Sequence, residues 1–321
     1  MVENYLSLIE AEIKKQNFGH QPKSLYAPIR YIMSLGGKRL RPLLTALSYS
    51  LYKNDVEKII PYAVAIEAFH NFTLLHDDIM DKAPLRRGKA TVHEKWNVNT
   101  AILSGDVMLV KVYDMFLDLE ENKLKEALRI FNQCAAAVCE GQQWDMEFER
   151  EKKITEIKYL EMIRLKTAVL LGLSLELGAL LADASVQDRK ALREFGVNIG
   201  VGFQLRDDWL DVYGDKKKFG KQVGGDIIGN KKTFLLIKAL EKANGKQKKE
   251  LGNWMARKKF NKTKKIKAVT SIYDSLNLSS LTEQKIKYYF EKGFDCLNNL
   301  SSPQKGRHLK DFVRSLINRE A

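Results

Sequence analysis

Asp77-Asp78-Ile79-Met80-Asp81 is the stretch that decides the fold prediction, and its spacing Asp-Asp-x-x-Asp returns at Asp207-Asp208-Trp209-Leu210-Asp211. Residues four apart share one face of a helix, so each run stacks its first and last carboxylates. Such carboxylates repel one another unless a cation binds them, and hard oxygen ligands suit Mg²⁺ together with substrate phosphates. We therefore expect two helices whose acidic faces bind Mg²⁺ and together grip one diphosphate across a shared cavity.

The apolar residues around both runs argue against a merely solvated acidic surface. Phe72, Leu75 and Ile79 surround the first run, and Leu205 and Val212 surround the second. Acidic side chains embedded in apolar sequence are expected to be partly buried, and buried charges need partners or a metal. A solvated helix face remains an alternative for one run alone, but two runs of the same spacing favour a ligand site.

The rest of the chain predicts an all-α fold. It has 321 residues, of which 45% are apolar, and this is enough for a large core. Apolar residues recur at three- and four-residue spacing, alternating strand patterns are missing, and no proline occurs between Pro84 and Pro303. A proline inside a helix costs about 3 kcal/mol, so this long proline-free stretch fits helices. We expect a single large helical bundle that forms one domain over residues 1–321.

Two segments are expected to be rich in loops, residues 82–99 and 213–230, and each directly follows an acidic run. Loops on a rigid scaffold commonly carry binding residues. Two Ser-x-x-acid spacings match the capping box and predict helix starts: Ser185 with Asp188, and Ser280 with Glu283.

Cysteine usage and hydropathy bear on the compartment. Cys134, Cys139 and Cys296 show no metal-ligand or disulfide pattern, so we expect them to fill the core of a cytoplasmic protein. The N-terminus lacks the features of a signal peptide. The longest apolar stretch, residues 167–184, contains acidic residues and is shorter than the roughly 20 apolar residues of a membrane span. It predicts a buried helix and no transmembrane segment.

The chain is basic, with a formal net charge of +14. Much of the excess lies in residues 216–267, and residues 245–267 are the densest part. Such a charge fits nucleic acid, anionic lipid or anionic small molecules as partners. Because only Trp254 and Phe260 are interleaved with the densest lysines, we favour a solvated helical hairpin and expect no nucleic-acid partner.

Basic residues also lie near the first acidic run. The run Gly36-Gly37-Lys38-Arg39-Leu40-Arg41-Pro42 precedes a helix and fits either an anion site at a helix start or a solvated turn. His70 lies two helical turns before Asp77 on the same face, where it either donates to a phosphate or fills the core. Arg86-Arg87 follows Asp81 and either clamps a phosphate or forms surface salt bridges.

Further cations accompany the second half of the chain. Lys166 opens the long apolar stretch, and Lys221 and Lys231 follow the second acidic run. Each fits a solvated lysine when it is considered alone. Together with Mg²⁺ at the aspartates, however, these cations would neutralise a diphosphate above an apolar cavity. That arrangement suits ionisation of an allylic diphosphate, because the leaving group is stabilised while water is excluded.

The motifs resemble those of trans-isoprenyl diphosphate synthases, the polyprenyl synthetase family, over about residues 26–318. The resemblance depends on the Gly-Gly-Lys-x-x-Arg-Pro run from Gly36, the first acidic run with its Arg-Arg-Gly, the Gly-Gln-x-x-Asp pattern from Gly141, the Lys-Thr pair at Lys166, and Gln204 before the second run. Two positions depart from the family pattern. Gly225 stands where threonine is frequent, and Ala90 stands where proline is frequent.

The resemblance implies the isoprenoid synthase fold around a deep central cavity, usually in a homodimer, and a set of residue roles. The Mg²⁺ ligands would be Asp77, Asp81 and Asp207, and Asp78 and Asp211 would support them directly or through bound water. Asp208 completes the set of six aspartates assigned to the metal site. The allylic diphosphate would be held by Arg86, Lys166, Gln204, Lys221 and Lys231. Isopentenyl diphosphate would be held by Lys38, Arg41, His70 and Arg87. The carbocation would be stabilised by Lys166, Thr167 and Gln204.

The implied reaction is a head-to-tail condensation. A dimethylallyl, geranyl or farnesyl diphosphate ionises, the double bond of isopentenyl diphosphate attacks the cation, and the departing pyrophosphate removes a proton. Phe72, five residues before Asp77, and Phe69, eight before, are expected to close the cavity, with the smaller Thr73 nearest the aspartates. One aromatic residue at the fifth position resembles synthases of geranylgeranyl diphosphate, and farnesyl diphosphate is the alternative product.

Three rival functions stay open at this point. A terpene cyclase would need no second diphosphate site, so Lys38, Arg41 and Arg87 discriminate against it. A non-catalytic partner subunit would usually lack aspartates that this chain keeps. A basic nucleic-acid-binding protein would bind with a steep salt dependence and would not transfer prenyl groups.

Overall fold

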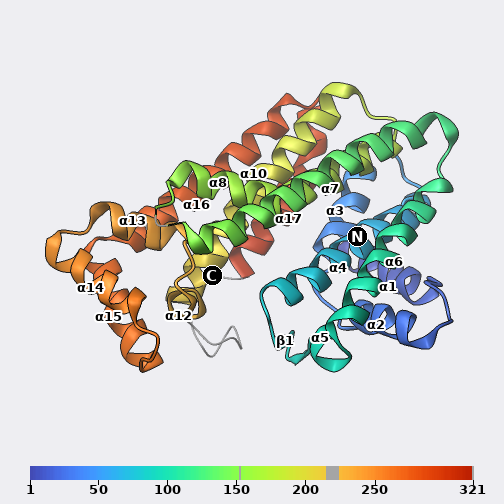
Figure 1. Ribbon diagram of the computed structural model, residues 1–321. Helices are drawn as coiled ribbons and strands as arrows, with labels where there is room; N and C mark the ends of the chain where they lie inside the picture. Colours follow the sequence, from blue (N-terminus) through green and yellow to red (C-terminus); the bar gives the residue numbers. More distant parts are fainter. Residues whose placement is uncertain (152, 215–223, 320–321) are drawn as a thin grey trace. The chain divides into compact units, whose positions relative to one another are not determined.

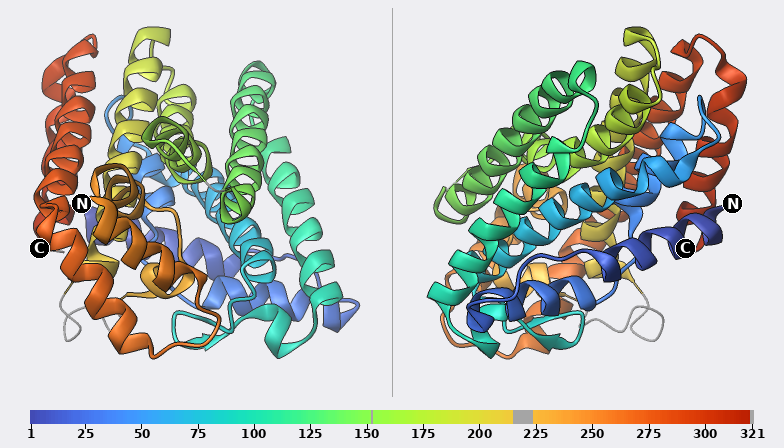
Figure 2. Two further views of the ribbon diagram at one scale, coloured as in Figure 1. Left: turned by 60° about the vertical axis from the view of Figure 1, so that its left-hand side comes forward. Right: turned by 90° about the vertical axis from the view of Figure 1, so that its right-hand side faces the viewer.

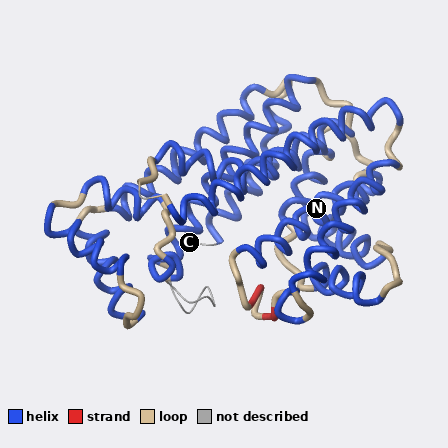
Figure 3. Tube along the Cα trace, viewed as in Figure 1, coloured by secondary structure: helices blue, strands red, loops and turns tan. Residues whose placement is uncertain are grey.

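The computed structural model describes residues 1–151, 153–214 and 224–319. Within these residues almost all regular structure is helical, as Figure 3 shows, so the prediction of an all-α fold is confirmed. The α-helices, labelled in part in Figure 1, are α1 (Val2–Lys15), α2 (Lys23–Ser34), α3 (Leu40–Tyr49), α4 (Ile60–Met80), α5 (Val92–Lys95), α6 (Val98–Leu117), α7 (Glu121–Arg150), α8 (Glu156–Ile163), α9 (Val169–Leu181), α10 (Val186–Tyr213), α12 (Gly225–Gly229), α13 (Phe234–Lys242), α14 (Gly245–Ala256), α15 (Lys262–Ser275), α16 (Leu278–Cys296) and α17 (Arg307–Arg319).

Short helical turns join several of these helices. The turn before α9, Arg164–Ala168, is a π-helix, a form that is often found at functional sites. The 3₁₀ turns are Val56–Lys58, Leu297–Asn299 and Pro303–Gly306.

A small hairpin lies in the first segment that was expected to be loop. Its strands are β1 (Leu85–Arg86) and β2 (Lys89–Ala90), which pair antiparallel. The two residues joining them, Arg87 and Gly88, have φ values of 52° and 73°. Positive φ at both central residues is typical of the tight turns that match the twist of paired strands. The expectation of a plain loop was incomplete, because two-residue strands are too short to show an alternating pattern.

The chain forms two compact units, which we describe separately. Unit 1 consists of Met1–Gln133, Leu173–Arg193 and Asn298–Ala321, and unit 2 consists of Cys134–Gly172 and Glu194–Leu297. The first acidic run therefore belongs to unit 1 and the second to unit 2. The organisation as one domain over residues 1–321 stays a prediction.

In unit 1, helix α4 carries the first acidic run at its end. Pro61 stands at the start of the helix, where its missing N–H is no loss, and residues 63–69 are buried. In both views of Figure 2, α4 and α6 lie side by side. A Cβ at Gly105 of α6 would come within 2.3 Å of His76 Nε2, so glycine leaves room for the imidazole in its present position. The packing fixes the helix that presents Asp77.

In unit 2, the second half of α10 carries the second acidic run. It packs against the π-turn before α9, since a Cβ at Gly200 would lie 2.6 Å from the Cα of Ala168. The same π-turn meets α7 at Gly141, where a Cβ would lie 2.2 Å from the backbone nitrogen of Lys166. Both glycines allow backbones to approach closely, and the catalytic candidates Lys166 and Gln204 lie on the segments that they join.

Several smaller expectations can be checked as well. The apolar stretch forms the end of the π-turn and the buried helix α9, and within the described residues no helix is long and apolar enough to cross a membrane. The hydroxyl of Ser185 accepts from Asp188 N (3.1 Å), which confirms one predicted helix start. Ser280 lies inside α16, whose N-cap is Asn277, so the helix start predicted at Ser280 was wrong. Cys134 and Cys296 are buried, but Cys139 is exposed and does not fill the core.

Candidate active site

The first acidic run ends α4. The backbone N–H of Asp81 donates to the carbonyl of Asp77 (2.8 Å), so the two residues occupy the last helical turn. Asp77 is half-buried and Asp81 is exposed. The C-terminal end of a helix carries partial negative charge, which makes it unfavourable for carboxylates and favourable for a cation. The position of these two acids therefore fits the binding of a metal ion.

Asp78 lies differently from its two neighbours. It is only 3% exposed, and Arg86 donates to both of its oxygens, Nε to Oδ2 at 2.8 Å and Nη2 to Oδ1 at 2.7 Å. This two-pronged pair neutralises the buried carboxylate and holds the β1–β2 hairpin against α4. The structure thus engages Arg86 with Asp78, whereas the sequence prediction placed Arg86 on the allylic diphosphate.

The residues predicted for isopentenyl diphosphate come together in unit 1. The guanidinium of Arg87 lies against Gly37, 2.8 Å from the place of a Cβ, and Gly37 has a φ of +141°. Arg41 Nη1 lies 3.0 Å from His70 Nε2. Lys38 is exposed beside Gly37. Gly37 thus leaves room for the guanidinium of Arg87 beside the loop before α3, which fits an anion site.

His70 is held neutral at the centre of this basic group. Arginine has only donors, so the Nε2 that faces Arg41 accepts. Burial, followed by the charges of Arg41, Arg87, Arg86 and Arg39, lowers the pKa of His70 well below its ordinary value. Positive charge collected in this way, with a neutral imidazole among it, favours a bound diphosphate.

The lowered pKa of His70 predicts a loss of stability in acid. Below about pH 6.5 the unfolded histidine takes up a proton that the folded one does not. His70 therefore costs more stability as the pH falls below this value and costs none above it. Melting temperatures of the protein and of His70→Gln between pH 7.5 and 5 should diverge, with the unmodified protein losing more. Inorganic pyrophosphate should reduce the difference, and parallel curves would contradict the prediction.

Arg39 is buried in unit 1 and has a structural role. Its Nε donates to Glu10 Oε1, its Nη1 to Glu67 Oε1 and its Nη2 to the carbonyl of Met33, each at 2.8 Å. It has a φ of 46° and is the N-cap of α3. The sequence grouped it with Lys38 and Arg41 as one of three cations near a helix start, and no local signal separates it from them.

The residues predicted to set product length lie on α4 as an aromatic stack. The ring of Phe69 is 5.7 Å from that of Phe72 and 5.0 Å from that of Phe131, and Phe72 lies 4.8 Å from the ring of His76. The hydroxyl of Thr73 donates to the carbonyl of His70 (2.8 Å), which turns it onto its own helix. Phe69 is fully buried and Phe72 half-buried, so Phe72 is the more accessible ring.

In unit 2, the second acidic run divides into one buried and two accessible acids. Asp207 is exposed, and Asp211 is half-buried and accepts from the backbone of Gly225 (3.2 Å) and Asp226 (2.9 Å). Asp208 is buried and accepts from the hydroxyl of Tyr159 and from Gln204 Nε2, the latter at 2.9 Å. Burial, and next the charge of Asp226, raises the pKa of Asp208 to about 8.

Crowded carboxylates around α12 fit a cation site. Burial, followed by the charge of Asp211, raises the pKa of Asp226 to about 6, and Lys231 opposes this rise. Within the described residues, no three His, Cys, Asp or Glu side chains form a group that could hold a metal on its own. Mg²⁺ typically takes one or two carboxylates and completes its shell with phosphates and water. The oxygen ligands of both acidic runs fit that donor set.

The catalytic candidates form a connected network in unit 2. The hydroxyl of Thr167 donates to Gln204 Oε1 (3.2 Å), and the amide of Gln204 donates to Asp208. Lys166 Nζ pairs with Asp145 Oδ2 at 2.6 Å. Both Lys166 and Thr167 lie in the π-turn. The network also includes Tyr159, whose hydroxyl donates to Asp208, 49 positions further along the chain. Sequence spacing alone does not reveal this link.

The two lysines predicted after the second run have different outcomes. Lys231 follows α12, and its backbone N–H donates to the carbonyl of Asp226 (2.9 Å), which closes the turn. Lys221 lies outside the described residues. The neighbouring Lys232 donates to the carbonyls of Phe148 and Glu149 at the end of α7, so it caps that helix.

Comparison with known proteins gives consistent matches. A family model described as polyprenyl synthetase matches residues 22–273. A short chain isoprenyl diphosphate synthase of Methanocaldococcus jannaschii is 43% identical over 250 residues, which are 78% of this chain and 76% of that protein. A geranylgeranyl diphosphate synthase of Sulfolobus acidocaldarius is 38% identical over 96% of this chain and 94% of its own. A crystal structure of a geranylgeranyl pyrophosphate synthase has a TM-score of 0.94, with 40% identity, and covers 100% of this chain and 99% of that one.

Proposed function

Because the chain belongs to the polyprenyl synthetase family, we propose that it condenses isopentenyl diphosphate with an allylic diphosphate to give geranylgeranyl diphosphate. It is a trans-prenyltransferase that makes a short-chain product. The observation that carries the proposal is the pair of acidic runs at the ends of α4 and α10, each with accessible carboxylates and each accompanied by cations of its own unit. Similar proteins named geranylgeranyl diphosphate synthase support the product.

In this proposal the six aspartates have two kinds of role. Asp77, Asp81 and Asp207 would hold Mg²⁺, which would supply positive charge for the departing diphosphate. Asp78 acts indirectly by holding Arg86, and Asp208 acts by orienting Gln204. The carboxylate of Asp211 holds the start of α12 by accepting from the backbone N–H groups of Gly225 and Asp226. The aspartate spacing is thus used partly for ligation and partly for support.

The remaining residues bind diphosphate and protect the cation. Arg41, Arg87, Lys38 and neutral His70 hold isopentenyl diphosphate, while Lys166 and Lys231 hold the allylic diphosphate. The C–O bond of the allylic diphosphate breaks, the double bond of isopentenyl diphosphate forms the new C–C bond, and a proton passes to the departing pyrophosphate. The hydroxyl of Thr167 and the amide oxygen of Gln204, which are hydrogen-bonded to each other, would stabilise the carbocation electrostatically.

One incubation tests the function. Purified protein with Mg²⁺, isopentenyl diphosphate and either dimethylallyl, geranyl or farnesyl diphosphate should consume isopentenyl diphosphate and give a C20 product. A terpene cyclase would release a hydrocarbon without consuming isopentenyl diphosphate. A non-catalytic subunit would leave all substrates unchanged, and a dominant C15 product would favour farnesyl diphosphate synthesis instead.

Truncating the accessible ring of the aromatic stack should lengthen the product. Phe72→Ala removes the half-buried ring, and Phe69→Ala, which opens the layer beneath it, should add to the effect in the double variant. Chromatography of the dephosphorylated products measures the shift beyond C20. Leu119→Ala on the loop after α6 is a matched control that should leave the product unchanged. An unaltered product in the double variant would reject this role.

We also propose a homodimer that pairs along α6. Leu103, Val110 and Leu117 recur every seven residues on this helix and are 57%, 58% and 62% exposed. An exposed apolar stripe of this kind is typical of a protein–protein contact. Analytical ultracentrifugation should give twice the mass of the chain. The cytoplasmic location stays a prediction from cysteine usage.

A further inference from the structure

Lys265 of α15 is a buried lysine. The sequence placed it among the solvated cations of residues 245–267, but it is only 1% exposed, whereas Lys264 beside it is exposed. Lysine is almost never fully buried unless it is paired. Among the described residues, Lys265 forms no ion pair with a carboxylate. Its ammonium group instead lies 4.4 Å above the ring of Phe260, and burial lowers its pKa.

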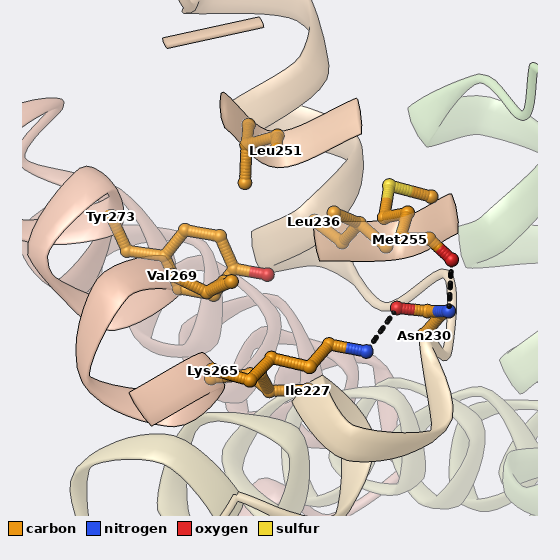
Figure 4. A pocket seen from close by; sticks show the side chains of 8 residues that line it. All are labelled: Ile227, Asn230, Leu236, Leu251, Met255, Lys265, Val269 and Tyr273. Atoms are coloured by element: carbon orange, nitrogen blue, oxygen red, sulfur yellow. Dashed lines mark hydrogen bonds between the residues drawn. The ribbon is translucent and has the colours of Figure 1, made fainter. Parts of the chain in front are cut away.

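The hydrogen bonds of Lys265 go to the turn that ends α12. Its Nζ donates to Asn230 Oδ1 at 2.6 Å and to the carbonyl of Ile228 at 3.1 Å. Asn230 has left-handed backbone angles, φ 55° and ψ 31°, and its side-chain nitrogen donates to the carbonyl of Met255 at the end of α14 (3.2 Å). One asparagine therefore joins α12, α14 and α15, as Figure 4 shows for the side chains.

The turn packs through Ile227 into an apolar cluster that also contains Leu251, Val269 and Tyr273. A pocket remains beside it, lined by Lys265 and Asn230 together with apolar side chains, and Figure 4 shows the hydroxyl of Tyr273 directed into the same space. Apolar packing of this kind is not directional, whereas hydrogen bonds fix the orientation of a turn. The hydrogen bonds of Lys265 to Asn230 and Ile228 add that directional restraint.

The turn also carries groups of the proposed active site. Asp226 at its start donates its backbone N–H to Asp211 of the second acidic run, and Lys231 directly follows Asn230. The turn is thus fixed at one end by Asp211 and at the other by the contact between Lys265 and Asn230. A shift at the second end would displace Lys231 before it displaced Asp211.

We propose that the Lys265–Asn230 contact positions Lys231 for the allylic diphosphate, which makes Lys265 and Asn230 positioning residues. The proposal rests on the function proposed above for Lys231. It predicts a selective effect, because isopentenyl diphosphate is assigned to residues of unit 1. Loss of the contact should weaken binding of the allylic diphosphate and leave binding of isopentenyl diphosphate unchanged.

Two variants remove the contact in different ways. Lys265→Met keeps the length of the side chain without the ammonium group, and Asn230→Gly keeps the left-handed backbone without the side chain. Each should raise KM for geranyl diphosphate about tenfold, the effect of losing a charged hydrogen bond. KM for isopentenyl diphosphate should stay unchanged. The double variant should raise this KM by less than the product of the two single effects, since both substitutions remove the Lys265–Asn230 contact. Lys264→Met, at the exposed neighbouring lysine, is the matched control.

The outcomes separate positioning from general stability. Unchanged KM values in both variants, or equal rises for both substrates with a lower melting temperature, would overturn the proposal. If the unmodified protein transferred no prenyl group, the proposed function would fail, and the contact would be judged by binding. In that case Mg²⁺ with inorganic pyrophosphate should raise the melting temperature of the unmodified protein and of Lys264→Met by similar amounts. The increase for Lys265→Met should be smaller. Equal increases in all three would overturn the contact's role.

Discussion

Asp77→Asn should lower kcat for prenyl transfer about 10³-fold, the usual scale for losing one electrostatic stabiliser of a leaving group. The substitution keeps the shape of the side chain and removes its charge at the last turn of α4. Because carboxylates are unfavourable at the end of a helix, the variant should fold at least as stably as the unmodified protein. Steady-state kinetics over a range of Mg²⁺ concentrations, together with melting temperatures, measure both effects.

Asp78→Asn is the informative comparison. Asp78 lies one residue away but gives both oxygens to Arg86 and is buried. Its replacement should lower the melting temperature, because the arginine loses its partner, while the Mg²⁺ concentration needed for half-maximal rate stays the same. Asp311→Asn, at an exposed acid of α17, should change neither property. A Mg²⁺ requirement shifted by Asp78→Asn but not by Asp77→Asn would mean that the ligand assignment is wrong.

This contrast shows what the acidic spacing can and cannot predict. The four-residue spacing predicts that Asp77 and Asp81 share a helical turn, and the structure has this arrangement. It does not distinguish ligands from supports, because the partner of Asp78 lies on a hairpin whose strands are too short to leave a pattern. The separation of roles requires tertiary contacts that no local window contains.

The cations show the same limit more strongly. Arg39, Arg41 and Lys265 all lie in basic runs, and no local sequence signal distinguishes a buried cation from a solvated one. In the structure Arg41 faces His70, and Arg39 is buried between two glutamates. Lys265 is buried and has no carboxylate partner among the residues that the structure describes. Burial of a charged side chain depends on which distant segments cover it, here Glu10 and Glu67 for Arg39 and the end of α12 for Lys265.

Arg39→Met should destabilise the protein by about 3–5 kcal/mol, the usual effect of removing one partner of a buried ion pair. The side chain of Glu67 is 3% exposed and would keep its charge without the guanidinium that now faces it. Glu10, whose side chain is 41% exposed, can be solvated and should contribute less. Denaturant unfolding should show the loss as an earlier transition. KM for isopentenyl diphosphate should rise because the side chain of Arg39 ties the start of α3, the helix that carries Arg41, to Glu10 and Glu67.

A second substitution separates the lost pair from lost packing. Arg39→Met combined with Glu67→Met leaves no buried charge, and a buried pair replaced by apolar side chains is often neutral in stability, so the double variant should recover much of the loss. Arg129→Met removes a surface pair with Glu126 and should cost at most about 1 kcal/mol. If Arg39→Met were no more harmful than Arg129→Met, the buried pair would not stabilise unit 1. Failure of the double variant to recover would instead assign the loss to the contacts of Arg39 with Met33 and Glu10.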